Sequence, residues 1–375
     1  MRFFSASSFF VILLVFAGCN KNDPEAGQNN NKDRQPMLVN WVDNIVIPSY
    51  EIFQTKLGIM ATSAEEFASA PSEALLQQLR EDWVNAYIEY QNVELFEFGP
   101  ADKYILRNYF NIYPADVSGI EENISDPSAN LQVPDAYPRQ GFPALDYLIN
   151  GVGNSDLEIV GFYTDETSGS ARINYLSTVI ARMEERLENV ISEWPSYRET
   201  FISKTGLDIG SSTGLVVNAF VLEYERYVRS GKIGIPAGVM VVTGGIPQPD
   251  KVEAFYKKDI SKILALTAHG AARRFFNGEA RETGEDGPSF KSYLDALEAK
   301  DETSGVLLST IINNQFELIE TKIEVLPDNF HSAVQNENEA MVEAYDAMQA
   351  LVRYLKVDMT SAMSVTITYT DNDGD

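Results

Sequence analysis

The chain has 375 residues, and 55 Asp and Glu residues against 29 Lys and Arg residues give it a formal net charge of −26. Such an acidic surface repels phosphate backbones, so it excludes nucleic acid as a partner and favours solubility, cations or basic partners. Apolar residues make up 44% of the chain, which is enough for a sizeable core in one large domain or two smaller ones.

The N-terminus has the pattern of a secretory leader. Arg2 precedes an apolar run, Phe9–Phe16, that is too short to span a bilayer and leads into Ala17-Gly18-Cys19. This ending is similar to a bacterial lipobox, so we expect residues 1–18 to be a signal peptide and Cys19 to carry a lipid. Residues 19–35 are rich in Asn and predict the lipid anchor and a flexible tether. The expected location is the cell envelope, on the outer membrane facing the periplasm or the cell surface.

Helical periodicity runs through residues 36–205. Apolar residues recur at spacings of three and four, and three stretches show the pattern clearly. They are a helix that opens at Pro71-Ser72 and runs towards Phe98, a short helix over Gly141–Gly151, and a long helix near Ser170–Ser192. In the short helix, Pro143 suits the first turn and Gly151 is a natural stop.

A Gly- and Ser-rich stretch, Gly206–Gly214, is the expected domain boundary, and helical patterns follow it. These helices are expected at about Thr213–Arg229, Lys251–Phe276, Ser289–Leu297, Ser304–Ile323 and Glu337–Lys356, with a loop over Gly231–Pro249. A strand is expected at Ser364–Thr370 because of its Val-Thr-Ile-Thr-Tyr run. The predicted fold is all-α, with two packed helical bundles over residues 36–205 and 206–375 and a short C-terminal strand.

Two acidic residues near the end of the first clear helix are candidate ligands. Glu94 and Glu97 lie three residues apart, so their like charges repel unless a cation or basic side chains offset them. One hypothesis is a metal site shared with Asp146, whose oxygen ligands suit Ca²⁺, Mg²⁺ or Fe³⁺. The alternative is ordinary ion pairing or exposure to solvent.

The segment Glu223–Pro236 offers basic partners for those acids. Its cations suit the C-terminal end of a helix, which is a sufficient structural explanation. If the two halves of the chain pack face to face, Arg226 or Lys232 is expected to meet Glu94, Glu97 or Asp146. The two histidines, at positions 269 and 331, have no second histidine at metal-ligand spacing, which favours structural or surface roles.

The stretches Glu94–Pro100 and Gly141–Tyr147 resemble the imelysin family, whose signature is Gly-x-His-x-x-Glu. The signature glycine is Gly141, its His position is Pro143 here, and its Glu position is Asp146. The resemblance implies two helical bundles with the motif near their junction, a place in the envelope, and a role in acquiring iron or other metals. It implies a binding region made of Gly141, Pro143, Asp146, Glu94, Glu97, Arg226 and Lys232.

The altered signature leaves three functions open. Pro143 has no lone pair for a metal, which favours a non-catalytic, lipid-anchored protein that binds iron, haem or another small ligand, together with envelope protein partners. Some imelysin-like proteins are classed as peptidases, so an atypical metallopeptidase is the first alternative. A surface module that binds a protein or a glycan is the second.

Overall fold

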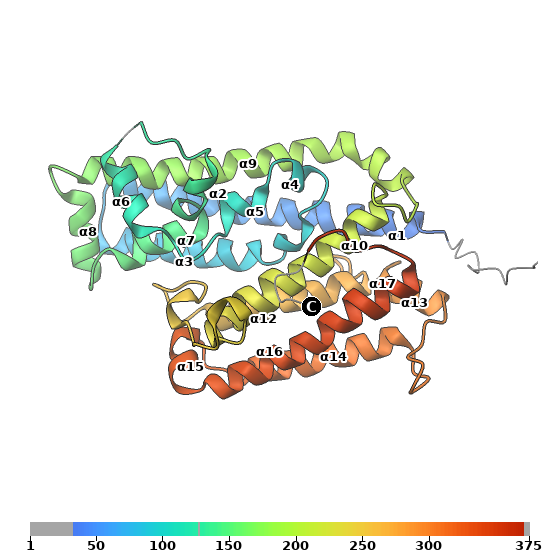
Figure 1. Ribbon diagram of the computed structural model, residues 1–375. Helices are drawn as coiled ribbons and strands as arrows, with labels where there is room; N and C mark the ends of the chain where they lie inside the picture. The colour runs from blue at the N-terminus through green and yellow to red at the C-terminus, as the bar shows by residue number, and fades with distance from the viewer. Residues whose placement is uncertain (1–32, 127, 371–375) are drawn as a thin grey trace, which may run out of the picture. The chain divides into compact units, whose positions relative to one another are not determined.

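The structure, a computed structural model, describes residues 33–126 and 128–370, and these residues are mostly helical (Figure 1). In this part of the chain β-pairing is limited to two isolated bridges, Glu279–Asp286 and Lys300–Leu307. The all-α prediction is therefore confirmed. The predicted signal peptide, Cys19 and nearly all of the tether lie outside the described residues.

The described residues fold mainly into α-helices, joined by connections of varied length. Those before residue 206 are α1 (Gln35–Asn40), α2 (Ile47–Ser69), α3 (Glu73–Tyr90), α4 (Pro100–Lys103), α5 (Leu106–Phe110), α6 (Val117–Ser125), α7 (Gly141–Asp146), α8 (Asp156–Thr164) and α9 (Gly169–Ser203). Those after it are α10 (Ser212–Leu222), α11 (Ile235–Ala237), α12 (Ser261–Asn277), α13 (Phe290–Ala296), α14 (Leu308–Glu324), α15 (Phe330–Asn336), α16 (Asn338–Arg353) and α17 (Thr360–Met363).

Helices of two other kinds complete the secondary structure. The 3₁₀ turns are η2 (Glu94–Phe96), η3 (Pro134–Arg139), η6 (Val241–Thr243) and η7 (Pro249–Lys251). The π-helical segments are η1 (Trp41–Val46), η4 (Tyr147–Gly151), η5 (Glu223–Gly234) and η8 (Tyr354–Met359).

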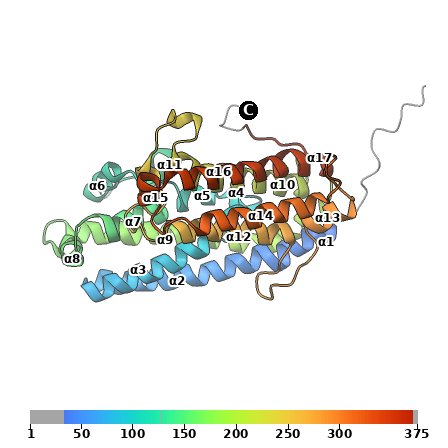
Figure 2. The ribbon, with the colours of Figure 1, turned by 90° about the horizontal axis from the view of Figure 1, so that it is seen from below.

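The long helices lie in two layers. Helix α2 packs against α3 and α9, and α14 packs against α12 and α16 (Figures 1 and 2). The layers touch where α3 meets α12 and where α10 meets η2. Buried apolar side chains run continuously through both layers. The division into separate bundles at residue 206 stays a prediction.

Two helices differ from the expected ones. Helix α3 ends at Tyr90 instead of running to Phe98, so Glu94 lies in a 3₁₀ turn. Helix α9 continues through Pro195 to Ser203, beyond the end expected near Ser192. Pro195 removes one backbone hydrogen bond. The rings of Trp194 and Phe201, on either side of it, pack against the Phe98 ring, with centroid distances of 6.1 Å and 5.8 Å.

The helix that begins at Ser212 continues much further than expected. It runs through π-helical η5 and α11 to Ala237, although a loop was predicted from Gly231. Gly234 fits the packing, since a Cβ there would lie 2.7 Å from the ring of Tyr345. Segments of π-helix are uncommon and frequently mark functional sites. The length of η5 therefore directs attention to its side chains.

The predicted C-terminal strand at Ser364–Thr370 is wrong. Within the described residues no strand pairs with this segment, which lies against α10 and forms hydrogen bonds with one of its side chains. The Thr368 amide donates to Asn218 Oδ1 at 2.7 Å, and Asn218 Nδ2 donates to the Thr366 carbonyl at 3.0 Å. Its β-branched composition predicted extended backbone, but a strand also needs a ladder partner.

None of the described helices combines the length and the apolar character that crossing a bilayer requires.

Candidate functional site

Gly141 opens the short helix α7 in a conformation that other residues rarely adopt. Its φ is +74°, and a Cβ at this position would lie 2.3 Å from the carbonyl oxygen of Phe110. The next residue, Phe142, stacks on the Tyr87 ring with centroids 4.4 Å apart. Pro143 lies in the first turn, as expected. The motif therefore packs α7 tightly against α3 and α5.

Asp146 is 1% exposed and is held almost entirely by backbone groups. Its carboxylate accepts hydrogen bonds from the amides of Tyr256 at 2.8 Å and Lys257 at 2.9 Å, and from Asn150 Nδ2 at 3.0 Å. Burial raises the pKa of Asp146 to about 7, against the opposing effect of these hydrogen bonds. The side chain thus fixes the segment around residue 256 against α7. Gly151 serves the same junction, because a Cβ there would lie 2.4 Å from the Tyr256 ring.

A second set of charges is buried where η5 meets the end of α3. Lys232, which is 1% exposed, donates from Nζ to Glu253 Oε2 and to Gln91 Oε1, both at 2.6 Å. The same Nζ lies 3.9 Å from Glu94 Oε2. Although burial alone would lower the pKa of Lys232, the carboxylates of Glu253 and Glu94 raise it. Lys232 therefore stays charged and joins two carboxylates from distant parts of the chain.

Neutral groups complete the environment of Glu253. Its Oε1 accepts from Asn111 Nδ2 at 2.8 Å, and the Tyr87 hydroxyl lies 3.0 Å away. Asn111 also donates to Glu94 Oε1 at 3.0 Å. The other oxygen of Glu94, Oε2, is buried and has no hydrogen-bond partner within the described residues.

Arg107 lies beside this cluster and joins it to η5. Its Nη2 donates to the carboxylate of Glu223 and, at 2.9 Å, to the backbone carbonyl of Glu94. Its guanidinium lies 4.0 Å from the ring centroid of Tyr227. Its backbone amide points the other way and donates to Glu97, at 3.2 Å to Oε2. We call Glu94, Arg107, Glu223, Lys232 and Glu253, with Asn111, the buried charge cluster.

The buried charge cluster contains more acids than bases. Three glutamates face one lysine and one arginine, and Glu97 adds a fourth carboxylate at its edge. Burial raises the pKa of Glu223 to about 8 and that of Glu97 to about 7, against the attraction of Arg107, and it also raises the pKa of Glu94. A buried excess of carboxylates must take up protons or a cation. The cluster is thus able to exchange protons near neutral pH or to hold added positive charge.

The structure brings together only some of the residues expected to form a site. Lys232 meets Glu94, as hypothesised. Arg226 does not meet the predicted acids, because it donates to the Thr370 carbonyl at 2.8 Å. The shared metal site of Asp146, Glu94 and Glu97 is not formed, since the described residues contain no group of three His, Cys, Asp or Glu side chains placed to hold an ion.

Sequence reasoning did not identify four members of the buried charge cluster as site residues, namely Arg107, Asn111, Glu223 and Glu253. Arg107 lies in the short helix α5, Asn111 follows it directly and Glu253 lies in a turn, and none of these three belongs to a motif. The partners of these residues lie up to 166 positions away. The available signal was indirect. Paired acids at Glu94 and Glu97 required a base, and Arg107 lay in an aromatic-rich segment directly after them.

The two histidines have structural contacts. His269 is 1% exposed, with Nδ1 2.8 Å from the Tyr224 hydroxyl and Nε2 2.9 Å from the Phe316 carbonyl. Because a carbonyl only accepts, Nε2 carries the proton. Burial lowers the pKa of His269 to about 4. His331 lies near the surface, with Nδ1 3.1 Å from the Pro249 carbonyl.

Comparisons with known proteins give one consistent result. The profile of the family described as Imelysin matches residues 46–356. Iron-regulated protein A of Synechococcus elongatus is 23% identical over 270 residues, which are 69% of this chain and 67% of that protein.

Two crystal structures share the fold. A protein from Parabacteroides distasonis, assigned as a candidate iron-regulated protein A precursor, superposes with a TM-score of 0.71 at 18% identity, over 90% of this chain and 96% of that one. An imelysin-like protein from Psychrobacter arcticum superposes with a TM-score of 0.67 at 16% identity, over 88% and 96% of the two chains. The predicted family resemblance is confirmed.

Proposed function

Because the chain belongs to the imelysin family, we propose that it is a lipid-anchored, non-catalytic binding protein of the bacterial cell envelope that serves the acquisition of iron, another metal or haem. The relative from Synechococcus elongatus carries the name iron-regulated protein A. Iron and haem are therefore the first ligands to test. The anchor at Cys19 and the position on the outer membrane rest on the sequence of the leader.

The observation that carries the non-catalytic assignment is the environment of Asp146. A hydrolytic metal needs protein ligands with free lone pairs and one position left open for water. Pro143 offers no lone pair, and the carboxylate of Asp146 is directed at the amides of Tyr256 and Lys257. The only two positions that carry the family signature's ligands thus stabilise the fold instead.

The buried charge cluster is the proposed site of cation binding. Its excess of carboxylates attracts a hard cation, which prefers oxygen ligands, although the described residues place no three acidic side chains together to hold one. Glu94 Oε2 accepts no hydrogen bond within these residues. Lys232 already lies between Glu94 and Glu253, so an incoming metal ion competes with an ammonium group for the same oxygens. A ligand that binds here must therefore displace Lys232 or bind beside it.

The purified mature protein, from Cys19 onwards, provides the test. We expect Fe³⁺ or haem to raise the unfolding temperature further at each higher ligand concentration, roughly with its logarithm, because a ligand that binds only the folded state stabilises it. Ca²⁺ and Mg²⁺ serve as the matched hard-cation controls. Failure of both Fe³⁺ and haem contradicts the role in acquisition and leaves a surface module for proteins or glycans as the function to test.

A peptidase assay separates the binding protein from the enzyme. We expect no peptide cleavage that a chelator abolishes. Cleavage that disappears both with chelator and in Asp146→Ala would establish the atypical metallopeptidase instead. Tightly held zinc at one ion per chain would point the same way.

Cell fractionation tests the anchor. We expect the full-length protein in the membrane fraction and Cys19→Ser in the soluble fraction, because the thiol is the site of lipid attachment. Equal distribution of the two proteins contradicts lipidation at Cys19.

A further inference from the structure

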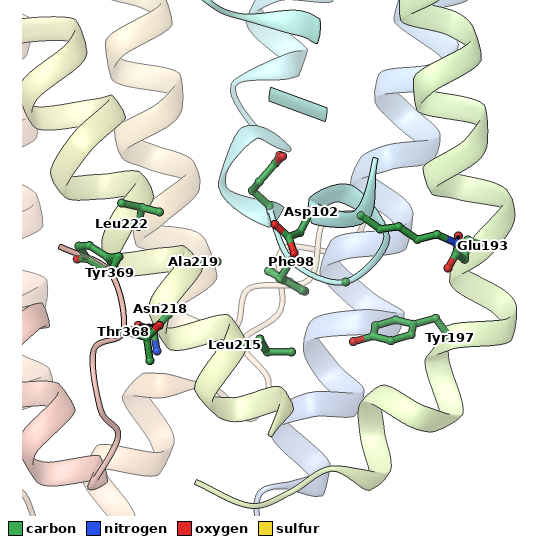
Figure 3. Close-up of a pocket in the computed structure, with 13 residues that line it drawn as sticks. Phe98, Asp102, Glu193, Tyr197, Leu215, Asn218, Ala219, Leu222, Thr368 and Tyr369 are labelled. Atoms are coloured by element: carbon green, nitrogen blue, oxygen red, sulfur yellow. Dashed lines mark hydrogen bonds and ion pairs between the residues drawn. The ribbon is translucent and has the colours of Figure 1, made fainter. Parts of the chain in front are cut away.

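A cavity of about 450 Å³ opens between α10, the end of α9 and the turn after η2, and it adjoins the buried charge cluster at Glu97 (Figure 3). Phe98, Leu215 and Leu222 contribute apolar surface, and the C-terminal segment closes one side with Thr368 and Tyr369. A volume of this size is typical of sites for small organic molecules, which are mostly apolar with a few polar groups.

The walls of this cavity are held rigidly. Phe98 stacks on Phe201 with ring centroids 5.8 Å apart and meets Trp194 edge-on at 6.1 Å. Gly99, at φ +58°, lets the chain pass Tyr197, since a Cβ there would lie 2.6 Å from the ring. Figure 3 shows the Tyr197 hydroxyl directed towards Leu215, across the cavity. The site is therefore preformed, so a ligand does not have to order its walls.

The charged groups around the cavity are unequal in number. Glu97, Asp102 and Glu193 line it, and Lys103 is its basic residue. Lys103 Nζ is already paired with Glu193 at 2.6 Å. Within residues 33–126 and 128–370, neither Glu97 nor Asp102 forms an ion pair, and the carboxylate of Glu97 accepts only from the Arg107 amide. Two carboxylates thus face an apolar cavity without a cation of their own.

We propose that this cavity binds a small organic cation, an ammonium or amidinium group on an apolar body, with the cation between Glu97 and Asp102 and the body against Phe98, Leu215 and Leu222. Carboxylates supply charge-assisted hydrogen bonds to an N–H cation. The aromatic rings add cation–π attraction, which a bare metal ion cannot combine with burial of apolar surface.

The electrostatic setting of Glu97 supports the assignment. Burial raises the pKa of Glu97 to about 7, although Arg107 on its other side opposes this. A bound cation favours the charged carboxylate and so offsets the loss of hydration that burial causes. The Arg107 amide donates to Glu97 and the Arg107 guanidinium donates to Glu223, so a ligand bound at Glu97 would also change the electrostatic environment of the buried charge cluster.

The proposal goes beyond the proposed role in iron acquisition, and its test is separate. Benzamidinium is the probe, because it joins a planar amidinium to an apolar ring of suitable size. Benzoate has nearly the same shape with the opposite charge, and benzyl alcohol is the neutral match. Binding to the mature protein is measured by calorimetry and by the shift of the unfolding temperature.

We expect saturable binding of benzamidinium and at least tenfold weaker binding of benzoate and benzyl alcohol. Glu97→Gln should weaken benzamidinium about tenfold, as expected for a partly buried charged hydrogen bond. Asp102→Asn should weaken it about threefold, because this carboxylate is exposed. The matched control is Asp135→Asn, which removes an exposed acid outside the cavity and should leave binding unchanged.

A variant that fills the cavity with a larger side chain tests whether binding depends on the cavity itself and not only on the negative charge of the protein. Leu215→Trp occupies the cavity without changing any charge and should abolish benzamidinium binding. Its unfolding temperature without ligand shows whether the protein still folds, and Leu222→Trp is the second filling variant. Equal affinity for benzamidinium and benzoate, no binding of benzamidinium, or unchanged binding in both Trp variants would overturn the proposal.

Discussion

Asp146 and Glu253 are both almost fully buried carboxylates, but different groups compensate their burial. Asp146 accepts from two consecutive backbone amides, at Tyr256 and Lys257. Glu253 accepts from the side chains of Lys232, Gln91 and Asn111. Backbone amides carry no net charge and are removed only by substitution to proline, whereas each side-chain partner can be lost singly. The comparison predicts that the buried charge cluster is the more sensitive region.

Lys232→Met should give the largest effect. Methionine fills a similar volume but leaves Glu253 and Glu94 buried without their cation, and breaking a buried pair in this way costs about 3–5 kcal/mol. The measurement is urea unfolding at neutral pH. Lys291→Met is the matched control, because Lys291 forms a half-exposed pair with Asp295 one helical turn away, and it should change stability by less than about 0.5 kcal/mol. Equal effects of the two substitutions would show that Lys232 does not compensate the cluster.

Lowering the pH should destabilise the protein through His269, a second buried group that is bonded to the backbone. Its pKa is about 4 in the folded protein, below the ordinary value of 6.5, because burial disfavours the imidazolium. The stability that this group contributes is fully present above pH 6.5 and is lost as the pH falls towards 4. The loss amounts to about 3 kcal/mol.

The measurement for His269 is the difference in unfolding free energy between wild type and His269→Gln at pH 7 and at pH 4. Wild type should lose about 3 kcal/mol more than the variant over this interval. His331→Gln removes a surface histidine and should show no such difference. A constant gap between wild type and His269→Gln at both pH values would contradict a neutral buried imidazole.

Asp146→Asn should have a smaller effect than Lys232→Met. An asparagine keeps one oxygen but places an N–H group against one of the two backbone amides, which leaves a buried donor unsatisfied at a cost of about 1–3 kcal/mol. Hydrogen exchange at the Tyr256 and Lys257 amides is the direct readout, and both should exchange faster in the variant. Unchanged protection of these amides would mean that Asp146 does not hold the segment.

The same contrast explains how much the sequence could reveal. Local patterns predicted the all-α fold, the start of α3 at Ser72, whose side chain accepts from the Leu75 amide, and the short helix at Gly141. They did not predict that η5 would continue past Gly231, because the close packing of Gly234 on Tyr345 depends on α16, more than a hundred residues away.

Site residues were harder to predict for the same reason. Lys232 was recognisable because it lies in a basic run, and its meeting with Glu94 follows once the halves pack together. Glu253 and Asn111 have no local pattern, and their roles are defined only by the folded chain. Asp146 was a candidate metal ligand because it occupies the Glu position of the family signature, while the first of its backbone partners lies 110 positions further on.

The smallest predicted effect on stability is that of Arg226→Ala, which tests whether the C-terminal segment and the Gly141 motif are independent of each other. Arg226 was a candidate partner of Asp146, but it donates to the Thr370 carbonyl near the surface, and the two side chains share no hydrogen bond. Arg226→Ala should therefore cost less than about 0.5 kcal/mol, and its effect should add to that of Asp146→Ala within the same margin. The double-mutant cycle is measured from the unfolding free energies of wild type, the two single variants and the double variant. A second cycle with Arg107→Ala in place of Arg226→Ala is the comparison, because it removes a buried cation. Neither residue contacts the other's partners, so the contacts predict no coupling. A coupling energy well above about 0.5 kcal/mol between Arg226 and Asp146 would contradict this and show that the C-terminal segment and the Gly141 motif are energetically linked.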